Sequence, residues 1–184
     1  MRAALALLLL LALPAAAQPR PAEAPGRDLD RAFAALRDAP DEAGGRMAES
    51  VIVQLWARQA SPAVALLLNR GIRNLRGGQA GEALEDFDAA LVLAPRLADA
   101  WHWRAQAHAR TGDAPAALAD LRECLRLEPR HFAALLTLSR VQEEAGDERG
   151  ALRSLEAALA IHPRLAGGEA RLRDLRRKVE GEAS

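Results

Sequence analysis

Proline returns at a fixed interval of 34 residues in the second half of the chain, at Pro95, Pro129 and Pro163. A self-similar period of this length is typical of helical hairpins that stack side by side into an array. Each proline would lie just beyond a helix, because its ring prevents the helix from continuing. The spacing therefore predicts an all-α repeat protein, and the stacked surfaces of such arrays usually bind partners.

Three consecutive units, 64–97, 98–131 and 132–165, align on these prolines. Small residues recur at three places, as expected where helices approach too closely for large side chains. They are Gly71, Ala105 and Ser139 at position eight, Ala83, Ala117 and Ala151 at position twenty, and Ala90, Cys124 and Ala158 at position twenty-seven. Larger apolar residues fill position four (Leu67, Trp101, Leu135) and position twenty-four (Phe87, Leu121, Leu155).

Each unit also contains residues suited to end one helix and begin the next. Gly78, Gly112 and Gly146 occupy position fifteen, where a left-handed backbone conformation would end the first helix. Asp113 and Asp147 follow directly, and their carboxylates can accept hydrogen bonds from the free N–H groups of the next helix. Every unit is therefore predicted to be a helix, a short turn, a second helix and a second turn.

With this pattern the units resemble the tetratricopeptide repeat family, which has a bulky residue at position four, small residues at eight, twenty and twenty-seven, and proline at thirty-two. The three units cover 102 of the 184 residues. The resemblance implies an all-α, right-handed α-solenoid with three repeats in residues 63–165. Two positions depart from the family: the usual tyrosine at position eleven is Asn74, His108 or Gln142, and position seven holds Arg70 and Arg104 in two units.

The first 17 residues have the features of a cleaved secretory signal peptide. Arg2 supplies a positive start, residues 3–13 are all alanine or leucine, and residues 15–17 are small alanines suited to cleavage. The alternative is an uncleaved membrane tether, although eleven helical residues would span only about half of a ~30 Å hydrocarbon core. The composition, rich in alanine, arginine and leucine, is typical of a bacterium with GC-rich DNA, so we expect a periplasmic protein.

The segment between the signal and the repeats is predicted to contain a linker and a helical hairpin. Residues 18–27 include three prolines and a glycine and should form an extended linker. Residues 28–62 contain a short amphipathic helix and then a second helix with two apolar rows, which are Leu29, Phe33 and Leu36 in the first and Met47, Val51, Leu55, Ala48, Ile52 and Trp56 in the second. We interpret this hairpin as a degenerate repeat that caps the array, and the alternative is a dimerisation element around Trp56.

The C-terminal segment, 166–184, is predicted to close the other end of the array. Leu172, Leu175 and Val179 form a narrow apolar stripe on a helix that is otherwise rich in arginine and lysine. A solenoid needs such a terminal helix, apolar inside and polar outside, to cover its last hydrophobic face. A basic patch for an acidic partner is the alternative interpretation.

Composition and residue spacing give no sign of catalysis, metal binding or nucleic-acid binding. The formal net charge is zero, whereas nucleic-acid binding requires a basic excess. His102 and His108 share a helix but face apart, His131 and His162 fall in turns between units, and the one cysteine, Cys124, occupies a small-residue position. Because three convergent ligands cannot be assembled from these positions, we expect no metal and no cofactor. Since no G-x-S-x-G or comparable nucleophile motif is present in the sequence either, we expect no enzymatic activity.

The resemblance places the binding surface on the first helix of each unit, where positions two, five, nine and twelve share one side. The candidate groove residues are Leu68, Ile72 and Leu75 in the first unit, Asp99, His102 and Gln106 in the second, and Leu136, Arg140 and Glu143 in the third. Such a groove is apolar at one end and of mixed charge at the other, which suits an extended or helical peptide segment. The alternative is that the upstream hairpin covers the three apolar residues of the first unit.

Two functional hypotheses follow from the sequence. The favoured one is an exported, non-catalytic adaptor or scaffold that binds a protein segment of the bacterial cell envelope in its concave groove. The alternative is a structural protein that forms homo-oligomers through the hairpin or the groove. Family members that bind chaperones hold a C-terminal carboxylate with lysine and asparagine at positions five and nine, and since Leu68 and Ile72 stand there, that activity is not expected.

Overall fold

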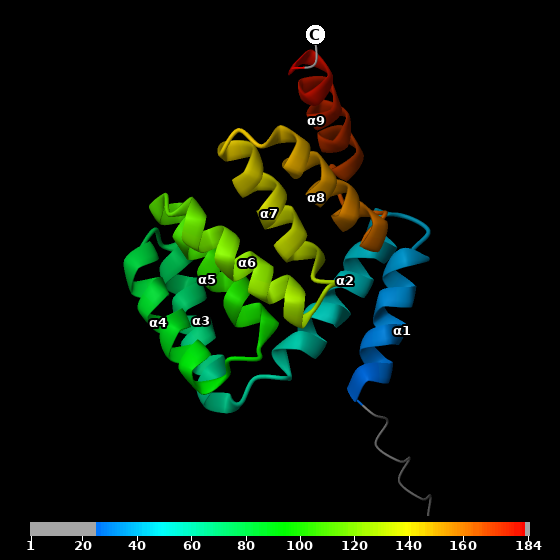
Figure 1. The fold of residues 1–184 in the computed structure, drawn as a ribbon. Helices are drawn as coiled ribbons and strands as arrows, with labels where there is room; N and C mark the ends of the chain where they lie inside the picture. The colour runs from blue at the N-terminus through cyan, green and yellow to red at the C-terminus, as the bar shows by residue number, and fades with distance from the viewer. Residues whose placement is uncertain (1–24, 183–184) are drawn as a thin grey trace, which may run out of the picture.

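In the computed structural model, residues 25–182 are described, and within them the fold is entirely helical (Figure 1). The helices are α1 (Pro25–Arg37), α2 (Glu42–Ala57), α3 (Pro62–Arg76), α4 (Ala80–Leu93), α5 (Ala98–Thr111), α6 (Ala114–Leu127), α7 (Phe132–Glu144), α8 (Glu148–Ile161) and α9 (Gly168–Glu182). The predicted all-α repeat architecture is confirmed. The predicted signal peptide, residues 1–17, lies outside the described residues.

The boundary predicted between linker and hairpin is wrong by three residues. Helix α1 begins at Pro25, so only residues 18–24 of the predicted linker 18–27 remain, and these lie outside the described part. Proline is favourable at the first position of a helix, because its missing N–H would have no partner there and its φ angle is already helical. Asp28 accordingly lies in the first turn of α1 and does not precede the helix.

Each repeat is a pair of antiparallel helices, α3–α4, α5–α6 and α7–α8, that pack side by side. The glycines that separate the two helices of a pair have the left-handed conformation predicted for them, with φ of 82° at Gly78, 82° at Gly112 and 81° at Gly146. The Asp113 carboxylate accepts a hydrogen bond from the Ala116 N–H at 3.0 Å, and Asp147 accepts one from Gly150 at 2.8 Å. These interactions set where the second helices of the second and third repeats begin.

A close helix crossing in the first repeat depends on a glycine. A Cβ atom placed on Gly71 would lie 2.6 Å from the nearest ring carbon of Phe87, which is fully buried. In the other two repeats the equivalent pairs are Ala105 with Leu121 and Ser139 with Leu155. A larger side chain at position twenty-four is therefore accompanied by a smaller one at position eight.

We expect Gly71→Ala to destabilise the protein by about 1–3 kcal/mol, because the buried phenylalanine ring must move to admit the methyl group. This loss would exceed the gain of about 1 kcal/mol in helix propensity. Urea unfolding measures the change, and Gly71→Ala combined with Phe87→Leu reproduces the second repeat and should recover most of the lost stability. Unchanged or higher stability of the single variant would show that the crossing is not tightly packed.

The two departures from the family pattern lie against each other in the structure. In the first repeat, Arg70 Nε and Asn74 Nδ2 donate hydrogen bonds to the buried Asp86 carboxylate at 2.6 Å and 3.1 Å. In the second repeat, Arg104 donates two hydrogen bonds to the buried Asp120, at 2.8 Å and 2.7 Å. Positions seven and eleven of the first helix thus carry polar side chains because position twenty-three of the second helix carries a buried acid.

The third repeat replaces this charged arrangement with a neutral one. Leu138 stands at position seven, and Gln142 and Ser154, at positions eleven and twenty-three, hydrogen-bond at 2.6 Å. The three positions therefore vary together from repeat to repeat, and each combination satisfies the polar groups that it buries.

The α1–α2 hairpin does not stack on the end of the array, so the prediction that it caps the first repeat is wrong. Its apolar core includes Phe132 and is flanked by Ala133 and Ile161, all from the third repeat. Figure 1 shows the hairpin beside α7 and α8, away from α4. The reason is visible at position ten of the first repeat, where Arg73 is exposed, whereas Val141 at the same position of the third repeat is buried against the repeat before it.

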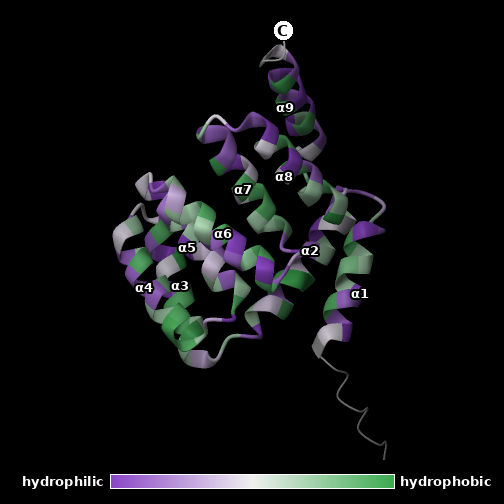
Figure 2. Cartoon of the chain, in the orientation of Figure 1, coloured by the Kyte–Doolittle hydropathy of each residue, from purple (hydrophilic) through white to green (hydrophobic). Residues whose placement is uncertain are grey.

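The C-terminal helix α9 covers the apolar side of the third repeat. Leu172 and Leu175 are buried with Leu155 and Leu159 of α8, whereas most of the α9 surface is hydrophilic (Figure 2). Glu143 of α7 accepts a hydrogen bond from Arg171 and another from Lys178, both at 2.6 Å. Hydrogen bonds from Lys178 and Arg171 lower the pKa of the Glu143 carboxyl below its ordinary value of 4.5.

The docking of α9 should therefore weaken in acid. Because its pKa is lower in the folded state, Glu143 contributes stability above the ordinary value of 4.5, and this contribution is lost as the pH falls through the folded value. We expect Glu143 to contribute about 1 kcal/mol to the stability of α9 docking at pH 6, since its two ion pairs are partly exposed. Amide hydrogen exchange of α9 at pH 6 and pH 3, corrected for intrinsic rates, should show this loss in the native chain and in Glu85→Gln. Glu143→Gln should exchange faster at pH 6 and lose no further protection, and an acid loss of the same size in this variant would contradict the assignment.

Candidate functional site

The predicted groove residues do not form one continuous surface. Leu68 and Leu75 belong to the apolar core between the first and second repeats, where they are 8% and 4% exposed. His102 is also buried, and the Gln106 side chain lies 3.1 Å from its Nε2 atom. Glu143 lies under α9 and serves to hold that helix.

Helix α2 packs against the start of the third repeat, on the side lined by the first helices. The Trp56 indole is stacked on the His131 imidazole, with ring centroids 4.3 Å apart and an interplanar angle of 11°. Phe33 of α1 and Phe132 of α7 complete the aromatic cluster, at 6.0 Å and 5.7 Å from the Trp56 ring. The sequence placed Trp56 in a possible dimer contact, whereas the fold buries it within the chain.

Polar contacts at the edge of this cluster fix the orientation of the hairpin. Arg130 donates a hydrogen bond to Asp30 at 2.7 Å and lies over the Phe33 ring at 4.3 Å. Glu49 of α2 lies 3.4 Å from His162 Nε2, and Arg164 donates to the Ala39 carbonyl at 3.2 Å. The hairpin is therefore held on the third repeat by one aromatic stack and several partly exposed polar contacts.

The two histidines that fall in turns between units, His131 and His162, are buried in the structure, and His131 joins a cluster. His131 and His102 have ring centroids 4.8 Å apart, and His131 Nε2 lies 3.0 Å from an Asp99 oxygen. Donor atoms of these three residues all lie within 4.8 Å of one another, which is the spacing of a candidate metal site among the described residues. The prediction that three convergent ligands cannot be assembled is therefore wrong, because the fold brings these three side chains together.

Hydrogen bonding accounts for this cluster without a metal ion. His131 Nδ1 accepts the Ala134 N–H at 3.1 Å as an N-terminal cap of α7, so its proton lies on Nε2 and is donated to Asp99. A metal at Nε2 would require that proton to move to Nδ1, where it would face the Ala134 N–H. His102 Nε2 already lies 3.1 Å from Thr137 Oγ1, and burial together with the neighbouring His131 lowers the pKa of His102.

The recesses of the described residues on the side of the first helices include two that several predicted groove residues line. The first, which we call the α2–α3 slot, has a volume of about 290 Å³ and lies between the hairpin and the first two repeats. It is lined by Val53, Trp56, Ala57, Ala60, Ala65, Leu68, Asn69, Ile72, Arg76, Leu97, Asp99 and Trp103. Most of these side chains are apolar, and the polar ones come from α3 and α5.

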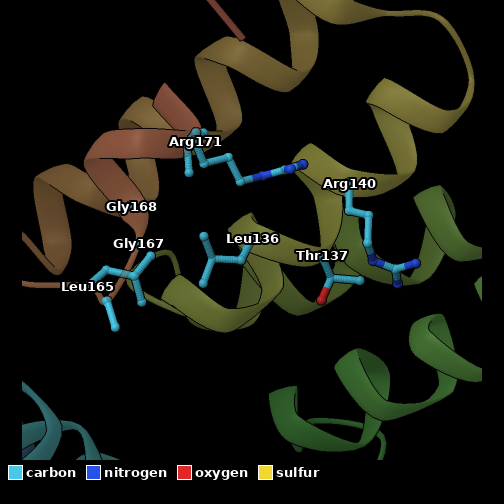
Figure 3. A pocket seen from close by; sticks show the side chains of 9 residues that line it. Leu136, Thr137, Arg140, Leu165, Gly167, Gly168 and Arg171 are labelled. Atoms are coloured by element: carbon cyan, nitrogen blue, oxygen red, sulfur yellow. The ribbon is translucent and has the colours of Figure 1, made fainter. Parts of the chain in front are cut away.

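The second recess, which we call the third-repeat pocket, has a volume of about 370 Å³ and lies between α7, α8 and α9. Figure 3 shows Leu136, Thr137 and Arg140 on α7, Leu165 and Gly167 before α9, and Gly168 and Arg171 in its first turn. In this view the Arg171 side chain extends from α9 toward α7. Both arginines already pair with acids of α7, Arg140 with Glu144 and Arg171 with Glu143.

The predicted groove residues are thus divided between two recesses and their surroundings. Leu68, Ile72 and Asp99 line the α2–α3 slot, and Leu136 and Arg140 line the third-repeat pocket. The sequence interpretation missed Val53, Trp56 and Trp103, which complete the slot. The exposed arginine at position ten of the first repeat was the available signal, because it shows that the hairpin must pack somewhere other than on the open end.

The cysteine and three of the histidines are buried within the fold. Cys124 is fully buried, and burial raises the pKa of its thiol, so it remains protonated. His102 and His131 are buried in the cluster above, and His162 packs edge-on against Phe132 at 5.5 Å. None of the described helices is both long and apolar enough to cross a membrane.

Comparison with known proteins shows which folds this architecture resembles. The tetratricopeptide repeat model matches residues 98–131, and comparison with curated proteins finds no match. Among solved structures, the first such domain of Spaghetti (RPAP3), bound to the HSP90 peptide SRMEEVD, is 18% identical with a TM-score of 0.62 and covers 65% of this chain and 95% of its own. The Sgt2 domain from Aspergillus fumigatus is 20% identical with a TM-score of 0.64, covering 67% and 83%, and the Arabidopsis OM64 domain is 19% identical with a TM-score of 0.60, covering 63% and 96%.

These likenesses define the described part of the chain as an α-solenoid of stacked helical hairpins. The unit at residues 98–131 matches the tetratricopeptide repeat model, and the solved structures of such domains share the fold of the described chain. At identities of 18–20% the solved structures show the fold alone and do not identify a binding site in this chain.

Proposed function

We propose that the chain is a non-catalytic adaptor of the bacterial cell envelope that holds a segment of another protein against the side of α3, α5 and α7. The observation that carries this proposal is the α2–α3 slot, a largely apolar recess open on that side. An apolar recess exposed to water gains free energy when an apolar partner covers it. The Spaghetti domain with its bound HSP90 peptide supports peptide binding by a fold of this kind.

The HSP90 peptide itself is not the expected partner. Leu68 and Ile72 stand where chaperone-binding members of the family carry lysine and asparagine, and Leu68 is buried in the core. A carboxylate placed at these two positions would lose water without gaining a hydrogen-bond donor.

The adaptor function is tested by selection from a random peptide library displayed on phage, with the full chain as bait. We expect recovered peptides that share a motif and bind the purified chain with a defined stoichiometry. If no peptide is enriched over a bait that has been unfolded by heat, the adaptor function is contradicted.

The proposed location rests on the apolar N-terminus and is tested separately. Cell fractionation and mass spectrometry of the expressed protein should find it in the periplasm, beginning at Gln18. A chain that retains Met1 and sediments with the membrane would support the tethered alternative, and a cytoplasmic chain would contradict both.

Self-association is the second candidate function, and exposed residues of α2 favour it. Met47 and Val51 lie one helical turn apart and are 72% and 46% exposed. Trp56 no longer supports this candidate, because it is buried in its stack on His131. Light scattering over a range of concentrations should give the mass of a monomer under the adaptor hypothesis, whereas a dimer that Val51→Glu dissociates would establish the alternative.

A further inference from the structure

The α2–α3 slot has a wall that the repeats alone would not provide. Val53, Trp56 and Ala57 come from α2 of the hairpin, and they face α3 and α5 across the recess. Val53 is 46% exposed, whereas Trp56 is 4% exposed and fixed by its stack on His131. The hairpin therefore makes one side of a cleft and holds that side rigidly.

The opposite wall carries an apolar row that ends in a cation. Leu68, Ile72 and Arg76 follow one another at intervals of four on α3, so they lie along one side of the helix. Arg76 is exposed in the last turn of α3 and makes no ion pair within residues 25–182. Asp99, which also lines the slot, is hydrogen-bonded to His131 at 3.0 Å. The Arg76 guanidinium is therefore available to pair with a carboxylate of a partner.

Asn69 adds a neutral hydrogen-bonding group to the same wall. Its side chain is exposed, lines the slot and has no hydrogen-bond partner among the described residues. An amide side chain can donate to a main-chain carbonyl and accept from a main-chain N–H. Asn69 can therefore bind the main chain of an extended segment independently of the sequence of that segment.

We propose that the α2–α3 slot is the partner site of the adaptor and that it takes an extended protein segment with large apolar side chains followed by a carboxylate. The proposal rests on the adaptor function above and specifies its site and its partner. The apolar side chains enter between Val53 and Ile72, the Asp or Glu carboxylate pairs with Arg76, and Asn69 binds the main chain. A volume of about 290 Å³ lies at the lower end of the range for ligand pockets, so it suits one or two side chains and not a whole helix.

The test uses fluorescein-labelled synthetic peptides and the full chain, with affinity measured by anisotropy. The first peptide carries two leucines followed by two glutamates in a glycine-serine background, the second has glutamine in place of glutamate, and the third has serine in place of leucine. We expect the first to bind about tenfold more tightly than either of the others, because each change removes one of the two recognised groups. Equal binding of all three peptides would overturn the proposal.

Two matched pairs of variants locate the binding. Val53 and Val51 are equally exposed, at 46%, and lie on the same helix, but only Val53 lines the slot. Val53→Glu should weaken binding of the first peptide about tenfold or more and Val51→Glu less than about twofold, since only the first places a charge in the apolar recess. Likewise Arg76→Gln should abolish the preference for glutamate over glutamine, whereas Arg73→Gln, three residues earlier and outside the slot, should retain it.

The outcomes separate this inference from the proposed function. Library peptides that bind equally well to Val53→Glu, or that lose affinity only in Arg140→Glu, would leave the adaptor function standing and overturn the slot as its site. A dimer that Val53→Glu dissociates would show that a second copy of the chain occupies the slot, and it would also overturn the proposal. Failure of both the library and the synthetic peptides to bind would contradict the adaptor function itself.

Discussion

Replacing Trp56 with alanine should detach the α1–α2 hairpin from the array. Trp56 is 4% exposed and contacts His131, Phe33 and Phe132, and truncation of a buried tryptophan costs about 3–5 kcal/mol. Apart from this aromatic cluster, the hairpin contacts the third repeat at the smaller or partly buried Ala133 and Ile161 and through partly exposed polar contacts, which contribute less. We therefore expect local opening of the hairpin while the repeats stay folded.

Amide hydrogen exchange measures this opening segment by segment. Protection should fall throughout α1 and α2 in Trp56→Ala and change little in α3–α6, whose core does not include the hairpin. Met47→Ala is the matched control, because Met47 is a large apolar residue of the same helix but is 72% exposed. An equal loss of protection in every helix would show that the hairpin and the array unfold as one unit, contrary to this account.

Replacing Arg104 with alanine should have a comparable effect on the stability of the array. Arg104 makes two hydrogen bonds to Asp120, which is only 4% exposed, and a third to Asp88 at 2.7 Å. Without the guanidinium, the buried carboxylate keeps only the His108 imidazole, 3.9 Å away, of the side chains paired with it here. Removing one partner of a buried ion pair costs about 3–5 kcal/mol, and urea unfolding measures it. Arg110→Ala changes an exposed arginine of the same helix and should have almost no effect.

The third repeat provides the rescue for this variant. Its neutral residues at the three equivalent positions are Leu138, Gln142 and Ser154. The combination Arg104→Leu, His108→Gln and Asp120→Ser copies them into the second repeat and should recover most of the stability, because no charge is then left buried without a partner. A triple variant no more stable than Arg104→Ala would show that the ion pair itself, and not the burial of an unpaired acid, determines the stability.

The repeat units were predictable because their constraints are local and periodic. The glycines at position fifteen, the aspartate caps and the small residues at crossings act within one hairpin, so aligning the units on proline was enough to find the helices. The position of the hairpin was not predictable from the same pattern, because it depends on a contact between Trp56 and His131, which are far apart in the sequence. Two residues on the outer side of the first repeat indicate that no helix packs there. One is Arg73, described above, and the other is Leu66. Leu66 is 67% exposed at position three, where Ala100 and Ala134 are fully buried.

In the candidate site, too, some residues were predictable from helical spacing and others were not. Ile72 and Arg140 were assigned to the binding side from helical spacing, and each lines a recess there. Leu75 was assigned by the same spacing but belongs to the core, because the second repeat covers that turn of α3. Spacing identifies the side of a helix, and only the fold shows how much of that side a neighbouring element covers.

We propose above that a partner segment binds in the slot between the hairpin and the first two repeats. Amide hydrogen exchange of the full chain, with and without a saturating peptide recovered from the library, tests it most directly. We expect added protection to be concentrated in the C-terminal half of α2 and in α3, around Val53 and Ile72, with little change in α9. Protection confined to α7 and α9, around Arg140 and Arg171, would contradict it.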